Sequence, residues 1–161
     1  MDTKLIRKEL LALLLGGNAH MGFDFAVSDF PMTDINKKIP NASYTIWHLL
    51  EHMRIAQWDI LDFTSDKEHV SPDFPDGYWP PEGENATPAK WKKTVQGFKA
   101  DLKALAAIAR SPKTDLFAPI PHAEGYTVFR EILLAADHNA FHIGELAALR
   151  RALGLNPVKE Y

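Results

Sequence analysis

The sequence predicts an all-α fold, namely a four-helix bundle with one long crossover loop between its second and third helices. Three observations predict it. The first two are that four long segments carry apolar residues at helical spacing and that no segment shows convincing strand alternation. The third observation is the segment 65–87, which holds four prolines and two glycines and should be irregular. With 161 residues, the chain is expected to form a single domain, residues 1–161, around one core.

The first helix is expected over residues 3–28, with Gly16 and Gly17 as a kink or interruption. The apolar run at residues 10–15 is too short for a signal peptide, and Glu9 lies directly beside it. We therefore interpret the start of the sequence as an amphipathic helix of the domain.

The other three helices have recognisable ends. The second is expected over residues 44–63, after the candidate caps Asn41 and Ser43. The third, over residues 88–110, opens on a threonine followed by a proline, which is typical of a helix start. The fourth, over residues 127–153, stops before a glycine.

The length of the crossover loop predicts that the second and third helices run parallel. Fully extended, this loop would reach roughly 75 Å, whereas a 20-residue helix is about 30 Å long. The chain can therefore return along the bundle before the third helix starts. Within the loop, Tyr78 and Trp79 would either cover a site as a lid or anchor the loop to the bundle.

Composition excludes several classes of protein. The formal net charge is −3, and the lysines and arginines are scattered, so a nucleic-acid partner is not expected. No segment approaches the roughly 18 continuous apolar residues of a membrane span, so no membrane partner is expected either. The absence of cysteine excludes disulfides and thiolate sites, and it favours a cytoplasmic location.

Two pairs of histidines have i, i+4 spacing: His48 and His52 in HLLEH, and His138 and His142 in HNAFH. Residues four apart on a helix share a face, with Cβ atoms about 5–6 Å apart, so both imidazoles of a pair can bind one ion. The alternative is that these histidines make hydrogen bonds across the bundle without a metal. His20, His69 and His122 lie outside the two pairs and are not expected to be ligands.

The fourth expected helix is apolar on most sides, which is typical of a helix at the centre of the packing. His138, His142 and Glu145 nevertheless share one stripe of it. Unpaired polar groups there would cost on the order of several kcal/mol, and a divalent cation would satisfy the imidazoles. Asn139 stands where a zincin protease has glutamate, so we exclude that class.

These motifs resemble the DinB-like superfamily. The resemblance consists of LLEH at residues 49–52, a long connection, and HNAFHIGEL at residues 138–146. In addition, YTIWHLLEHMRIAQWDIL at residues 44–61 looks like the second helix of that superfamily, and the likeness covers nearly the whole chain. The superfamily includes thiol-dependent transferases and proteins described as metal-dependent hydrolases. The resemblance implies an up-down-down-up four-helix bundle and, because many members are dimers, a homodimer.

The resemblance also implies a metal site of three histidines. Carried over to this chain, His138 and His142 are the pair from the last helix, and His52 is the third ligand. His48, one turn earlier, competes with His52 as ligand or supports it. The implied cofactor is one divalent metal ion, Zn²⁺, Ni²⁺ or similar, because imidazole nitrogen suits several such ions.

Three imidazoles on one ion leave coordination positions open, which is the arrangement of catalytic sites. Glu145, close to His142, is predicted to take part in catalysis, either by accepting a proton or by orienting a ligand imidazole. The alternative is that it pairs with Arg150 or Arg151 at the end of the bundle.

Three functions follow as hypotheses. The first is a metal-dependent enzyme that acts on a small-molecule substrate by hydrolysis or thiol-linked transfer. The second is a metal-binding or ligand-binding stress or accessory protein without turnover. The third is a plain helical dimerisation module in which the histidines only make hydrogen bonds.

Overall fold

The computed structural model describes residues 3–39 and 41–155, and most of this part of the chain is helical. The helices are α1 (Thr3–Leu15), α2 (Phe23–Val27), α3 (Ile46–Ser65), α4 (Pro88–Arg110) and α5 (Val128–Ala152), with a 3-10 turn η1 (Asp76–Tyr78). Two strands, β1 (Pro119–Ile120) and β2 (Ala123–Thr127), form a small antiparallel sheet. The predicted helical character of the chain is therefore confirmed, although the fold is not purely α.

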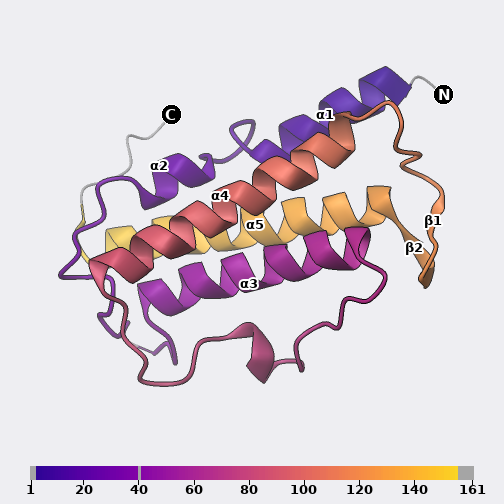
Figure 1. Ribbon diagram of the computed structural model, residues 1–161. Helices are drawn as coiled ribbons and strands as arrows, with labels where there is room; N and C mark the ends of the chain where they lie inside the picture. Colours follow the sequence, from indigo (N-terminus) through magenta and orange to yellow (C-terminus); the bar gives the residue numbers. More distant parts are fainter. Residues whose placement is uncertain (1–2, 40, 156–161) are drawn as a thin grey trace.

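The four long helices pack along their lengths (Figure 1). Helix α3 contacts α4 and α5, and α1 contacts the same two helices. Figure 1 shows α3 and α4 running in one direction and α1 and α5 in the other. The segment between α3 and α4 returns along the length of α3, as its length predicts. This arrangement places α3 and α5, which carry the two histidine pairs, side by side.

The interruption expected at Gly16 and Gly17 is confirmed, but the helix expected over the rest of residues 3–28 is wrong, since residues 16–22 are not helical. Helix α1 ends at Leu15, and Gly16 and Gly17 follow with φ angles of 73° and 90°. These angles lie in the left-handed region, which a right-handed helix does not include and which glycine adopts without steric penalty. The chain therefore leaves the helix at Gly16, and the short α2 is a separate element.

The expectation that no strand would form is also wrong. Strands β1 and β2 pair in antiparallel register, with Pro119 opposite Thr127 and Ile120 opposite Ala123. A two-residue strand is too short to show alternation of apolar and polar residues, so sequence periodicity could not detect it. The hairpin fills part of the connection between α4 and α5.

Helix α3 starts two residues later than expected, and neither Asn41 nor Ser43 is its cap. Thr45 is the cap residue: its side chain accepts a hydrogen bond from the backbone N–H of His48 at 3.2 Å. In return, Nδ1 of His48 accepts from the backbone N–H of Thr45 at 3.4 Å. This reciprocal capping box satisfies two backbone donors at the start of α3. Both ends of α4 agree with the prediction.

Apolar side chains from all four long helices form the core. Helical spacing predicts Trp47, Trp58 and Trp91 in it; Trp47 and Trp91 are buried there, whereas Trp58 is only half-buried. A polar pair crosses this core: Asn139 donates to the side-chain carbonyl of Gln57 at 2.8 Å. Gln57 in turn donates to the backbone carbonyl of Phe98 at 2.7 Å. These hydrogen bonds fix the position of α5 along the axes of α3 and α4, because sliding α5 would leave buried amide groups unpaired.

Across the described residues, no helix combines the length and the apolar character that crossing a membrane requires.

Candidate metal centre

Three histidines from two helices meet at one point between α3 and α5. Nε2 of His52 lies 3.1 Å from Nε2 of His138 and 3.2 Å from Nε2 of His142. One ligand atom from each of the three residues lies within 4.8 Å of the others. The structure therefore brings together the three residues that the sequence singled out.

The helices explain this convergence. His138 and His142 lie one turn apart on α5, and their ring centroids are 4.5 Å apart. Because α3 packs against α5, the facing side chain of His52 reaches both rings, with centroid distances of 5.0 and 4.9 Å. Backbone spacing brings the first pair of rings together, and helix packing adds the third.

The distances between the nitrogens suit a shared ion. Two imidazole nitrogens bound to one ion at about 2.0–2.1 Å are about 2.9 Å apart at a right angle and about 3.3 Å apart at a tetrahedral angle. The observed separations of 3.1 and 3.2 Å fall between these values. The two separations that involve His52 therefore suit a shared divalent ion, and a ligand nitrogen of His138 lies within 4.8 Å of one of His142.

Hydrogen-bond partners assign the protons of two rings. The carbonyl oxygen of Tyr78 lies 2.9 Å from Nδ1 of His52, and a carbonyl can only accept, so this nitrogen carries the proton. Nδ1 of His142 lies 2.9 Å from Oε2 of Glu145 and donates to the ionised carboxylate. In neutral rings, Nε2 of His52 and Nε2 of His142 therefore both present lone pairs, and these face one another.

Hydrogen bonds do not assign the proton of the third ring, that of His138. Nδ1 of His138 is buried and has no hydrogen-bond partner among the residues that the structure describes. Without a metal, His138 could donate its Nε2 proton to Nε2 of His52, which would satisfy one of the two close contacts. Nε2 of His52 and Nε2 of His142 would still face each other as two hydrogen-bond acceptors, with no proton between them.

Burial keeps the cluster neutral. Burial, with a smaller contribution from the neighbouring histidines, lowers the pKa of His138 to about 4 and the pKa of His142 to about 3. It also lowers the pKa of His52, although the hydrogen bond to the Tyr78 carbonyl opposes this. Neutral imidazole is the form that binds metal ions, so the rings need no deprotonation at neutral pH.

Glu145 lies beside the cluster and contacts it through His142. Its second carboxylate oxygen accepts a hydrogen bond from the hydroxyl of Tyr44. Burial raises the pKa of this carboxyl group. The alternative pairing with Arg150 or Arg151 is not seen among the described residues: Glu145 contacts His142 and Tyr44, and the Arg150 guanidinium donates to the backbone carbonyl of Ser28 at 2.8 Å.

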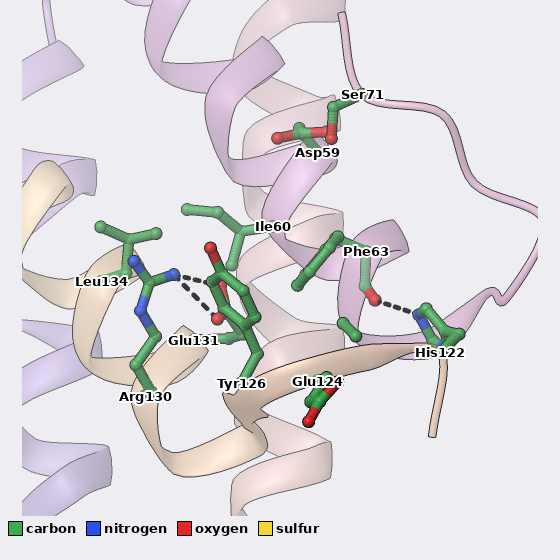
Figure 2. A pocket seen from close by; sticks show the side chains of 11 residues that line it. Asp59, Ile60, Phe63, Ser71, His122, Glu124, Tyr126, Arg130, Glu131 and Leu134 are labelled. Atoms are coloured by element: carbon green, nitrogen blue, oxygen red, sulfur yellow. Dashed lines mark hydrogen bonds and ion pairs between the residues drawn. The ribbon is translucent and has the colours of Figure 1, made fainter. Parts of the chain in front are cut away.

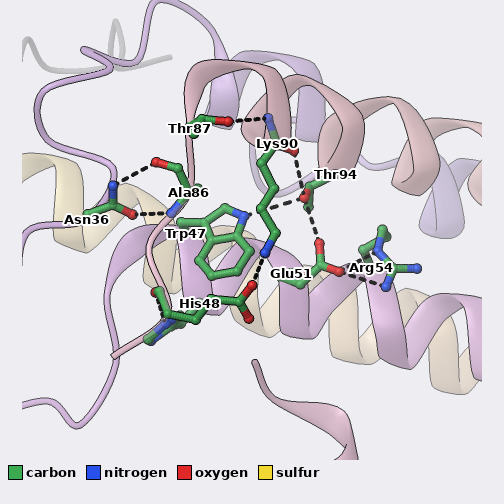
Figure 3. A network of polar contacts seen from close by, with 10 residues as sticks. Asn36, Trp47, His48, Glu51, Arg54, Ala86, Thr87, Lys90 and Thr94 are labelled. Atoms are coloured by element: carbon green, nitrogen blue, oxygen red, sulfur yellow. Dashed lines mark hydrogen bonds and ion pairs between the residues drawn. The ribbon is translucent and has the colours of Figure 1, made fainter. Parts of the chain in front are cut away.

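His48 lies outside the cluster. One of its ring nitrogens belongs to the capping box at the start of α3, and Nε2 donates to the backbone carbonyl of Glu84 at 2.8 Å. Figure 3 shows it beside Trp47, near the polar network in which the Thr94 hydroxyl donates to Glu51. The remaining histidines also contact groups elsewhere: His20 a neighbouring carbonyl, His69 a carboxylate and His122 the carbonyl of Phe63.

Two aromatic residues adjoin the cluster. The indole of Trp79 stacks on the imidazole of His52, with centroids 4.0 Å apart and planes 3° apart. The ring of Tyr44 lies 5.2 Å from that of Trp79. The sequence predicted that Trp79, in the proline-rich loop, would be part of a lid or an anchor. Nothing in the sequence indicated a role for Tyr44 beyond its place near a helix start.

A cavity of about 420 Å³ lies between α3, β2 and the start of α5. Figure 2 shows Ile60 and Phe63 of α3 on one side and Tyr126 and Arg130 on the other. Leu134 also lines it, one helical turn before His138 on α5. The cavity is thus a neighbour of the histidine cluster along the same pair of helices.

Comparison of the chain with family models, with curated proteins and with solved structures found no match in any of the three. The role of the histidine cluster must therefore be argued from its own geometry.

Proposed function

We propose that this chain is a DinB-like metal-binding protein in which His52, His138 and His142 bind one divalent ion. The observation that carries the proposal is the contact of two acceptor nitrogens, Nε2 of His52 and Nε2 of His142, at 3.2 Å. A cation between them turns an unfavourable contact into two metal–ligand bonds. The third ring presents Nε2 to the ion when its proton is on Nδ1, although no residue in the described part of the chain accepts that proton.

The proposal includes the architecture of the DinB-like superfamily, an up-down-down-up four-helix bundle made of α1, α3, α4 and α5. Its support is the parallel course of α3 and α4 and the packing of α1 and α3 on the same two helices. A homodimer and a cytoplasmic location are part of the same proposal and stay predictions.

The ligand set narrows the choice of metal. Three neutral imidazoles favour Zn²⁺, Ni²⁺ and similar ions over Mg²⁺ and Ca²⁺, which prefer oxygen ligands. The chain has no cysteine that could add a thiolate ligand. We therefore expect a first-row transition metal or zinc.

We further propose that the protein is a metal-dependent enzyme acting on a small molecule by hydrolysis or thiol-linked transfer. A divalent ion with open positions supplies a Lewis acid to water, a thiol or a carbonyl group. Glu145 holds the Nδ1 proton of His142, and Tyr44 holds Glu145, so both orient a ligand imidazole. The role of Glu145 as a proton acceptor stays a prediction, since both of its oxygens already accept hydrogen bonds.

The neighbouring cavity is our candidate for the part of the substrate that does not react. Its volume of about 420 Å³ suits a small molecule. Ile60, Phe63 and Leu134 give it apolar walls, whereas Arg130 supplies a polar group.

Metal analysis of untagged protein tests the site. We expect about one divalent ion per chain, and its loss in His138→Ala and in His142→Ala. His122→Ala is the matched control, because it removes a histidine that hydrogen-bonds to the carbonyl of Phe63 instead. Stoichiometric metal in both cluster variants would refute this site assignment, whereas wild-type protein that holds no metal would leave the plain helical dimerisation module.

A turnover screen separates the enzyme from the non-catalytic stress or accessory protein. Esters, amides and thiol acceptors are tested with the metal-loaded protein, the metal-free protein and the His142→Ala variant. The enzyme hypothesis predicts turnover only with metal, whereas metal binding without turnover in the whole screen would favour the accessory protein.

A further inference from the structure

The crossover loop returns to the metal centre at two consecutive residues, Tyr78 and Trp79. The carbonyl of Tyr78 accepts the Nδ1 proton of His52 at 2.9 Å, and Trp79 stacks on the same ring. The hydrogen bond selects the tautomer whose Nε2 lone pair faces the cluster, and the stacking fixes the plane of the ring. The orientation of one candidate ligand therefore depends on where this loop lies.

One carboxylate holds the loop in place. Asp59 lies two turns after His52 on α3 and is buried. Its Oδ2 accepts a hydrogen bond from the hydroxyl of Tyr78 at 2.7 Å, and its Oδ1 lies 2.7 Å from Nε2 of His69. Figure 2 shows the Asp59 carboxylate at one end of the cavity described above. A single side chain thus holds two points of the loop on the helix that carries His52.

Two features keep Tyr78 in contact with Asp59. Burial, together with the hydrogen bond to Asp59, raises the pKa of Tyr78 to about 12, so its hydroxyl stays a donor. The turn before it is tightly packed: a Cβ atom on Gly77 would lie 2.8 Å from Cβ of Pro72. Only glycine fits there without a shift of the loop. Tyr78 is therefore held both by its side chain and by the turn that precedes it.

Anchoring a long loop is by itself a sufficient reason for an aspartate–tyrosine hydrogen bond. The structure adds that the anchored residue is also the one whose carbonyl accepts the proton of His52. The two bonds of Tyr78 thus form a chain from Asp59 to the candidate ligand.

We propose that Asp59 and Tyr78 are positioning residues of the metal centre: the carboxylate holds the tyrosine, whose carbonyl sets the tautomer and ring plane of His52. The proposal rests on the metal site of the proposed function and extends it to residues that bind no metal. Loss of a hydrogen-bond partner of a ligand histidine typically weakens metal binding by about 10–100-fold.

Titration of the untagged, metal-free protein with Co²⁺ tests the proposal. We expect Tyr78→Phe and Asp59→Ala each to weaken Co²⁺ binding by about tenfold or more. We also expect both to change the visible absorption spectrum of the bound ion, which reports the ligand geometry. Asp115→Ala is the matched control, since this aspartate is exposed and accepts a hydrogen bond from the backbone N–H of Phe117 instead, and it should leave affinity and spectrum unchanged.

Thermal unfolding of the metal-free variants separates positioning from general stability. If Tyr78→Phe and Asp59→Ala lower the unfolding temperature but keep the Co²⁺ affinity and spectrum of the wild type, the residues only anchor the loop and the proposal is overturned. If the wild type itself binds no Co²⁺, the proposed metal site fails first and the positioning role fails with it.

Discussion

The two i, i+4 histidine pairs have the same spacing but different surroundings. On α5, His138 and His142 both point to one spot, with ring centroids 4.5 Å apart. On α3, only His52 joins them. His48 lies at the start of its helix, where one ring nitrogen closes the capping box and the other donates to the carbonyl of Glu84.

The difference shows what helical spacing can and cannot decide. Spacing places two side chains on one face of a helix, but it does not say which polar groups each ring meets. A helix start offers unpaired backbone N–H groups, and a histidine three residues into the helix is close enough to accept from one. One turn further on, His52 faces α5 instead. Position along the helix therefore separates a structural histidine from a candidate ligand.

The largest expected effect compares the two histidines of α3 directly. We predict that His52→Ala weakens Zn²⁺ binding by more than about a hundredfold, beyond the range typical of residues that only support a ligand. We predict that His48→Ala keeps the metal stoichiometry of the wild type, because its ring contacts Thr45 and Glu84. Isothermal titration of both untagged variants measures this, and the reverse result would make His48 the ligand.

The next largest effect is a loss of stability of the metal-free protein in acid. The pKa of His138 is lowered to about 4 in the folded protein from the usual 6.5, so below pH 6.5 the unfolded chain takes up protons that the fold excludes. The free energy of unfolding of the metal-free protein should therefore fall between about pH 6.5 and pH 4, by on the order of 3 kcal/mol. Denaturant unfolding at several pH values measures it.

Carboxylates also titrate in this range, so the informative quantity is a difference. A double variant, His138→Asn with His142→Asn, has no imidazole on α5 to protonate and should lose less stability over the same interval. Equal losses in the two proteins would show that the cluster does not resist protonation.

The smallest effect concerns the two histidines of α5, which differ in their outer partners. Nδ1 of His142 donates to Glu145, whereas Nδ1 of His138 has no partner in the described part of the chain. Glu145→Gln keeps the size of the side chain and removes its charge, so we predict metal binding weakened by about tenfold. Competition with a colour-changing chelator measures the affinity. Unchanged affinity would mean that the carboxylate does not support His142.

Helix patterning was enough to predict the mostly helical fold, both ends of α4, and the course of the long loop. It was also enough to place His138, His142 and Glu145 on one stripe of α5, because backbone geometry alone sets that arrangement. Gly16 marked the weak point of the first helix, but the sequence could not say whether the chain would kink or leave the helix there. The β1–β2 hairpin was missed because β1 has only two residues and because β2, whose central residues are all exposed, shows no alternation of apolar and polar side chains.

The sequence by itself determined which residue types were available: seven histidines, no cysteine, and two helical pairs of imidazoles. The tertiary structure decided which of them meet. Helix packing brought His52 to the α5 pair, and the returning loop brought Tyr78 and Trp79 onto its ring. Such contacts join residues far apart in the chain, so they depend on the packing of whole elements rather than on local spacing.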